Sequence, residues 1–147
     1  MVAAYADIRL HASCVASVAL ATGTVAEFAH KRDVLRRHCE ALGTDFDAIT
    51  LSSNFNTVIG TDAADVARRL DTLEARVAPY LGPEKTAHFI ADFHSPNAAV
   101  GTPEQVVARL AERRELGLDY VISYFPEAAY DRSGLELWAS EVVPALH

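Results

Sequence analysis

The sequence predicts an α/β fold in which parallel strands alternate with amphipathic helices. Residues 49–59 and 120–125 have the pattern of strands, and residues 6–11 form a weaker third candidate. Helical patterns with start and stop signals lie between them, an alternation typical of parallel β–α–β units. The 147 residues suffice for one domain with a substantial core, but a complete eight-stranded β/α barrel needs about 250.

The first predicted helix begins at Thr24 and ends before Gly43. Thr24 and Glu27 match a capping box, in which the hydroxyl and the carboxylate each bond a free backbone N–H group. Gly43 tolerates the positive φ that often ends a helix. The apolar residues at helical spacing are Val25, Phe28, Leu35, Cys39 and Leu42. One side of this helix is therefore expected to pack on another element.

The strand predicted at 49–59 is followed by a second helix. Thr61 or Asp62 can cap the start of this helix. Pro79 and the Gly-Pro pair at 82–83 are expected to close it, because proline lacks the backbone N–H group that a helix interior needs.

The next helix has the strongest start signal in the chain. Thr102 can serve as the N-cap, Pro103 occupies the first helical position, and Gln105 can complete a capping box. Gly117 is expected to end this helix. The stretch before it is less regular, and a short helix or a strand is predicted at 88–93.

A sheet built from these strands has open edges. The strand at 120–125 is followed by a last helix that begins at Ser133 or Gly134. Two or three parallel strands cannot close a barrel, and their edges leave backbone groups unpaired. We therefore expect a second polypeptide to join the strands.

Composition and charge argue against several classes of protein. Thirteen Lys and Arg residues against 20 Asp and Glu give a net charge of −7, which argues against nucleic-acid binding. No run approaches the roughly 20 apolar residues of a membrane span. The apolar run at 12–21 resembles a secretory signal only weakly, because it is poor in Leu and follows the acidic Asp7. Two cysteines, Cys14 and Cys39, are too few for a disulfide framework and predict a cytoplasmic protein.

No metal site and no catalytic pair are predicted. His88 and Asp92 would share a helix face with His94 nearby, but three ligands without further His or Cys in register form a weak pattern. His38 and Cys39 are adjacent, so a helix would point their side chains about 100° apart. Cys39 is therefore expected in the core.

Several motifs resemble the luciferase-like monooxygenases, a family of flavin-dependent and coenzyme F-420-dependent oxidoreductases. The run KRDVLRRHCEALG resembles the family's LRxHCxxxGRD, with Thr-Asp here in place of Arg-Asp. VGTPEQV is similar to the helix start GTPEEV, and LGLDYVI is similar to the strand start aGvD. EVVPAL is similar to the closing EVLPxL, and AYAD to the YAD that begins the sixth unit. The run KRDVLRRHCEALG occupies residues 31–43, VGTPEQV occupies 100–106 and LGLDYVI occupies 116–122. EVVPAL occupies residues 141–146, and AYAD occupies residues 4–7.

This resemblance implies a partial, TIM-type barrel: a single domain over 1–147 with a divergent segment at 1–23 and the C-terminal half-barrel at 24–147. FMN or coenzyme F-420 (a deazaflavin) is the implied cofactor. Family members carry their Gly-rich phosphate-binding loop just before the YAD motif, and this sequence has no glycine before Gly23. The implied partner is a second copy in a homo-oligomer or a separate N-terminal half.

The resemblance also implies where a cofactor ring would lie, because ligands of β/α barrels bind at the C-terminal ends of the strands. The candidate cofactor-binding residues are Asn54, Phe55, Asn56, Ser123, Tyr124 and Phe125. The alternative is that those side chains that point inward belong only to the core. Catalytic residues and the substrate stay unassigned.

Two hypotheses of different classes follow. The first is a truncated luciferase-like oxidoreductase or monooxygenase that is active only when another chain completes it. The second is a non-catalytic, degenerate paralogue that acts as a dimeric scaffold or binding module. A third possibility is that the chain starts at an internal Met of a longer product. Binding of FMN or of the deazaflavin distinguishes the first two.

Overall fold

The computed structural model describes residues 17–19 and 24–146 of the chain. They form two compact units. The first contains the described residues up to Asn54 and the segment Arg113–Ile122, and the second contains Phe55–Glu112 and the residues from Ser123 onward.

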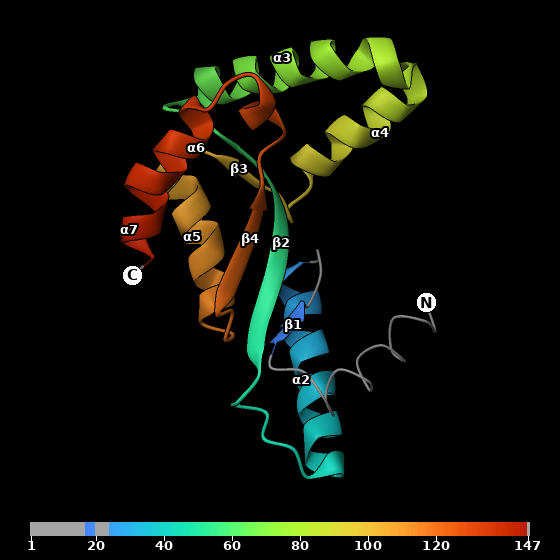
Figure 1. Cartoon of the computed structure of the whole chain (residues 1–147), viewed down its shortest axis with the longest axis vertical. Coiled ribbons are helices and arrows are strands. Elements are labelled where there is room, and N and C mark those ends of the chain that lie inside the picture. Colours follow the sequence, from blue (N-terminus) through green and yellow to red (C-terminus); the bar gives the residue numbers. More distant parts are fainter. Residues whose placement is uncertain (1–16, 20–23, 147) are drawn as a thin grey trace. The chain divides into compact units, whose positions relative to one another are not determined.

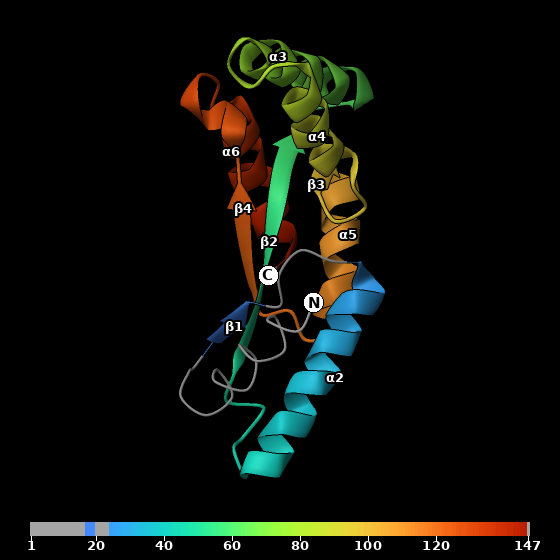
Figure 2. The same cartoon turned by 90° about the vertical axis from the view of Figure 1, so that its right-hand side faces the viewer.

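One long strand organises the sheet. Strand β2 (Thr50–Ile59) pairs in parallel with β1 (Ser17–Ala19) at its start and with β3 (Ala99–Gly101) at its end. Strand β4 (Tyr120–Tyr124) also pairs with β2 (Figure 1), and Figure 2 shows the two arrows pointing the same way. The α/β fold with parallel strands is thus confirmed, whereas the strand predicted at 6–11 lies outside the described residues.

Helix α2 (Val25–Leu42) begins with the predicted capping box. The Thr24 N–H group donates to Glu27 Oε2 at 2.7 Å, and the Glu27 N–H group donates to Thr24 Oγ1 at 3.2 Å. Gly43 ends the helix with a φ of 68°. The buried residues of this helix are Phe28, Val34, Leu35 and Cys39. Cys39 is therefore a core residue, as predicted.

Helices α3 (Ala63–Leu81) and α4 (Pro83–His94) follow β2. The Asp62 side chain caps α3 by accepting a first-turn backbone N–H group at 2.8 Å. Of the two predicted stop signals, Gly82 ends α3 with a φ of 74°, but Pro79 lies inside the helix. Pro79 is in the last turn, where a missing N–H group removes one hydrogen bond without breaking the rest of the helix.

The structure resolves one open alternative in the middle of the chain and confirms one predicted helix start. Residues 88–93 belong to helix α4 and not to a strand. Helix α5 (Pro103–Arg114) starts at the predicted position, where the Thr102 N–H group donates to Gln105 Oε1 at 3.0 Å. The Thr102 hydroxyl bonds Glu104 Oε2 at 2.7 Å, so the capping box forms on one side only.

The last part of the chain is a series of short helices. The 3-10 helix η1 (Pro126–Ala129) follows β4 after one residue, Phe125. Helix α6 (Ser133–Leu137) begins where the sequence predicts, and it continues through the π-helical turn η2 (Trp138–Val142) into α7 (Val143–Ala145). Within residues 17–19 and 24–146, no helix combines the length and the apolar character needed to cross a lipid bilayer.

The core of the second unit lies between α3, α4 and the end of β2. Figure 2 shows both helices beside the tip of this strand. Phe93 is 2% exposed, and its ring centroid lies 5.2 Å from that of Phe89. The buried members of this cluster are Val58, Leu70, Leu73, Ile90 and Phe93. Leu70 and Leu73 of α3 therefore pack in one cluster with Val58 of β2.

Replacing Phe93 by Ala should lower the free energy of unfolding by about 3–5 kcal/mol, because the truncation leaves a cavity in this cluster. Tyr80→Ala is the matched control: Tyr80 is an aromatic residue on α3 that is 88% exposed, and its loss should change the free energy by less than about 0.5 kcal/mol. Urea unfolding followed by circular dichroism measures both values. Equal losses would show that the core is wrongly placed.

Candidate functional site

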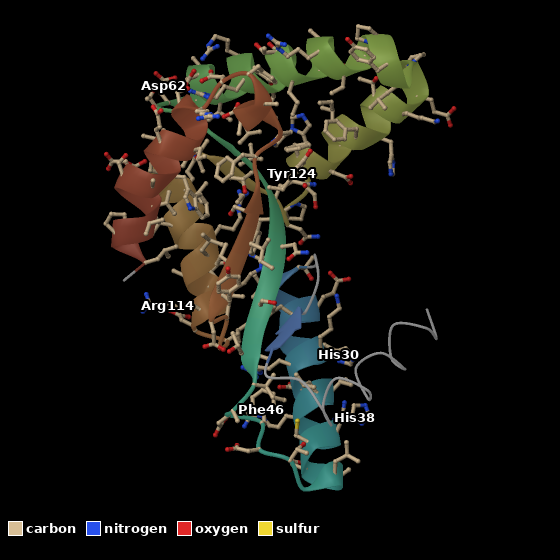
Figure 3. The ribbon with its side chains drawn as sticks, viewed as in Figure 1. His30, His38, Phe46, Asp62, Arg114 and Tyr124 are labelled. Atoms are coloured by element: carbon tan, nitrogen blue, oxygen red, sulfur yellow. The ribbon has the colours of Figure 1, made fainter. Side chains whose placement is uncertain are left out.

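The candidate residues lie near the C-terminal ends of β2 and β4. In β/α folds this end of the strands carries the ligand site, because the loops there are free to vary while the strands hold them in place. Strand β2 ends at Ile59 and strand β4 ends at Tyr124. Figure 3 labels Tyr124 near the tip of β4.

The three candidates on β2 divide between its two faces. Successive side chains of a strand point to opposite faces, so Asn54 and Asn56 share one face and Phe55 points to the other. Asn54 is exposed and Asn56 is half-buried, whereas Phe55 is 2% exposed. The two amides are therefore open to a ligand, while Phe55 belongs to the core.

The three candidates at the end of β4 divide in the same way. Ser123 and Phe125 are half-buried and share one face, and Tyr124 is 58% exposed on the other. The Phe125 ring contacts Trp138 edge-on, with a centroid distance of 5.6 Å and an interplanar angle of 79°. Phe125 thus anchors the end of β4 to the last helices.

The Ser123 hydroxyl is an unsatisfied polar group. Its Oγ atom is buried and has no hydrogen-bond partner among the residues that the structure describes. Almost all buried polar groups in folded proteins are hydrogen-bonded, so an orphaned hydroxyl at a strand end indicates a missing partner. This observation distinguishes Ser123 from the other five candidates.

Strand β4 pairs with β2, and two hydrogen bonds define the register at the start of the pairing. The Asp119 N–H group donates to the Leu51 carbonyl at 2.9 Å, and the Leu51 N–H group donates to Asp119 Oδ2 at 2.9 Å. We infer, by continuing this register along two regular parallel strands, that Ser123 lies beside Asn56 with its side chain on the same face of the sheet.

A buried ionic cluster, which sequence analysis did not predict, surrounds Arg69 of α3. The Arg69 side chain is 7% exposed. Its Nη1 donates to Glu127 Oε1 at 2.9 Å, its Nη2 to Ser133 Oγ at 2.7 Å, and its Nε to Asp65 Oδ2 at 3.0 Å. Asp131 Oδ2 lies 3.6 Å from Nη1. Arg69 therefore ties α3 to the segment that follows β4.

The two carboxylates closest to Arg69 respond to burial in opposite ways. Burial raises the pKa of Glu127, and the attraction of Arg69 offsets this only in part. Burial also opposes ionisation of Asp65, but hydrogen bonds from Arg69, Arg68 and the Thr61 N–H group outweigh it and lower the pKa of Asp65. Glu127 is 2% exposed and Asp65 is 16% exposed, so burial opposes ionisation more strongly at Glu127, while Asp65 accepts more hydrogen bonds.

Gly134 makes room for the Glu127 carboxylate. A Cβ atom at this position would lie 2.1 Å from Glu127 Oε1 and 3.3 Å from the Ile59 carbonyl oxygen. The carboxylate is buried and accepts a hydrogen bond from Arg69, so moving it away from such an atom would disturb that contact. A side chain at position 134 would therefore force the Glu127 carboxylate to shift.

The histidines do not assemble a metal site among the described residues. His88, Asp92 and His94 are exposed on α4, and no group of three potential ligands is found in the described part of the chain. Figure 3 labels His30 and His38, which both lie on α2.

Solved structures share this fold at low sequence identity. The coenzyme F420-dependent tetrahydromethanopterin reductase of Methanopyrus kandleri matches with a TM-score of 0.71 and 16% identity, over 97% of this chain and 49% of its own. Monooxygenase RslO1 from Streptomyces bottropensis matches with a TM-score of 0.68 and 16% identity, over 97% of this chain and 46% of its own. The EDTA monooxygenase EmoA of Chelativorans sp. BNC1 matches with a TM-score of 0.69 and 17% identity, over 95% of this chain and 43% of its own. No protein-family model matches the chain, and no curated protein matches its sequence significantly.

The chain spans about half the length of these enzymes. The prediction of a partial β/α barrel is confirmed. The resemblance to the luciferase-like family, first seen in short motifs, is confirmed at the level of the fold.

Glu127→Gln and Asp65→Asn should change the pH dependence of stability in opposite directions. The pKa of Glu127 is raised in the folded state, so its contribution to stability is present below the unfolded pKa of 4.5 and is lost as the pH rises through the folded pKa. Wild type should therefore lose stability relative to Glu127→Gln as the pH increases. A lowered pKa gives stability that is present above 3.8 and is lost in acid, so wild type should gain stability relative to Asp65→Asn over the same range. Urea unfolding between pH 3 and pH 7 measures both differences. Parallel slopes would contradict the assigned environments.

Proposed function

We propose that this chain is the C-terminal half of a β/α-barrel oxidoreductase or monooxygenase of the luciferase-like type, which uses FMN or coenzyme F-420. The observation that carries the proposal is the fold match, which covers nearly all of this chain and about half of each enzyme. One of these proteins is named for its dependence on F420, and a riboflavin lyase solved with a modified FMN matches with a TM-score of 0.69.

The residues at the end of β4 are chemically suited to such a cofactor. The ring edges of flavins and deazaflavins carry carbonyl and N–H groups, which a hydroxyl and a carboxamide can bond. Ser123 offers a buried hydroxyl without a partner, and Asn56 offers a half-buried amide. In this proposal both groups orient the ring, and Phe125 helps to exclude water from it.

When bound, the cofactor would supply the hydride or oxygen chemistry, and the chain would supply position and shielding. Asn54, whose side chain is exposed, is a further candidate for contact with the cofactor. Phe55, which is buried on the other face of β2, would act through packing, whereas Tyr124, on the other face of β4, is exposed.

A second polypeptide is part of the proposal. Strand β4 pairs with β2 but with no other described strand, and its Tyr120 and Ile122 are 59% and 43% exposed. An edge strand with exposed apolar side chains is a template for further pairing. The partner would be a second copy of the chain or a separate N-terminal half, in the cytoplasm.

Titration of the chain with FMN and with F-420, followed by ring fluorescence, tests the cofactor assignment. Quenching is expected below about 100 μM, and Ser123→Ala should weaken binding about two- to tenfold because it removes one hydrogen bond. Ser140→Ala, an exposed serine on η2, is the matched control and should bind like wild type. Absence of quenching with either cofactor would favour the non-catalytic scaffold.

Size-exclusion chromatography with light scattering tests self-completion. A homo-oligomer is expected if a second copy joins the sheet edge, and Ile122→Lys should shift it toward monomer because it places a charge on that edge. Thr50→Lys, an exposed position at the start of β2, serves as the control. A wild-type monomer would exclude the homo-oligomer and leave the separate half as the partner.

A further inference from the structure

The first unit contains a hollow that the proposed function does not use. It has a volume of about 320 Å³, within the range of small-molecule sites. Helix α2 contributes Arg32 and Arg36 to its wall, and the loop before β2 contributes Phe46, which Figure 3 labels. The loop before β4 contributes Glu115 and Asp119.

One arginine of this hollow is already engaged, and the other is available. Arg32 Nη1 donates to the Leu116 carbonyl at 3.1 Å, and Arg32 Nη2 pairs with Asp33 at 2.9 Å. Arg36 lies over the Phe46 ring, 4.3 Å from its centroid, and forms no ion pair with a described residue. The stacking holds the Arg36 guanidinium in place and leaves its N–H groups for an anion.

The same hollow carries carboxylates that do not neutralise Arg36. Asp47 and Glu115 are exposed and form no ion pair with a described residue. Asp119 uses one oxygen to accept the Leu51 N–H group, which leaves its other oxygen. Positive and negative groups therefore line one cavity without pairing with each other.

Separated charges of both signs select a ligand that also carries both. A ligand with only a carboxylate would be attracted by Arg36 but repelled by the three carboxylates of the hollow. A ligand with only an amine would be attracted by those carboxylates but repelled by Arg36. Ile49 and Leu51, both buried, line the same hollow and suit an apolar side group. We propose that this hollow binds a small zwitterion of the α-amino-acid type, with its carboxylate on Arg36 and its ammonium group on the Asp47–Glu115–Asp119 side.

Binding of leucine to the ¹⁵N-labelled full chain, followed by NMR, tests this proposal. The two matched probes are 4-methylpentanoate, which lacks the ammonium group, and 3-methylbutylamine, which lacks the carboxylate. Leucine should shift the Leu51 and Asp119 amide signals at up to about 20 mM and bind about tenfold more tightly than either analogue, since each loses one charge-assisted contact.

Two variants locate the two ends of the ligand. Arg36→Met should weaken leucine about tenfold and leave the amine unaffected, whereas Glu115→Gln should weaken leucine and the amine but not the carboxylate. Arg37→Met is the matched control, because Arg37 is the next residue on α2, is exposed and does not line the hollow. Dispersed amide spectra of all variants confirm that they fold.

Three results would overturn the proposal. They are an absence of shifts with leucine, leucine binding no more tightly than its analogues, and equal behaviour of Arg36→Met and Arg37→Met. A hollow filled by another polypeptide, or by another part of this chain, would give the first result.

Discussion

Strand β2 is hydrogen-bonded to every other described strand, and this shared pairing is the constraint on which the fold depends. Parallel neighbours cannot be joined by a tight turn, so each new partner of β2 must return along a crossover that contains a helix. Helices α2, α3 with α4, and α5 are these crossovers. The order of elements along the chain is therefore a direct consequence of one central strand with parallel partners.

Charged and polar side chains cluster where these helices and their loops lie next to the strand ends. After β4, the Arg69 cluster fixes the turn that follows Tyr124, because an arginine buried to 7% exposure must be matched by carboxylates held at hydrogen-bond distance. Such a cluster adds little net stability, since desolvation offsets the attraction. Its effect is on geometry: it holds η1 and the start of α6 against α3, and with them the residues next to Ser123.

The loops before the strands carry a different set of groups from the loops after them. Before β2 and β4 lie Phe46 and Glu115, which line the hollow beside Arg36. At the end of β4 lies Ser123, whose buried hydroxyl lacks a partner among the described residues. The two proposals thus rest on separate residues and separate observations, and the failure of one would leave the other standing.

Local signals in the sequence determined most of the secondary structure. The Thr24–Glu27 capping box, the stop at Gly43 and the helix start at Pro103 all involve groups within four residues of each other, so their hydrogen bonds follow from local spacing. The prediction that Pro79 ends its helix was wrong, because a proline in the last turn removes only one backbone hydrogen bond. The alternation of strand patterns with helix patterns along the chain likewise predicted parallel β–α–β units.

Only the tertiary structure decided which polar groups meet. Arg69 and Glu127 are separated by 58 residues, and nothing in the spacing of either one marks it as buried. The same holds for Arg36 and Glu115, which line one hollow from distant segments, and for Ser123, whose missing partner becomes visible only once its neighbours are placed. Hydrophobic periodicity predicts which face of an element turns inward, but contacts between elements depend on register and crossing geometry, which no local pattern encodes.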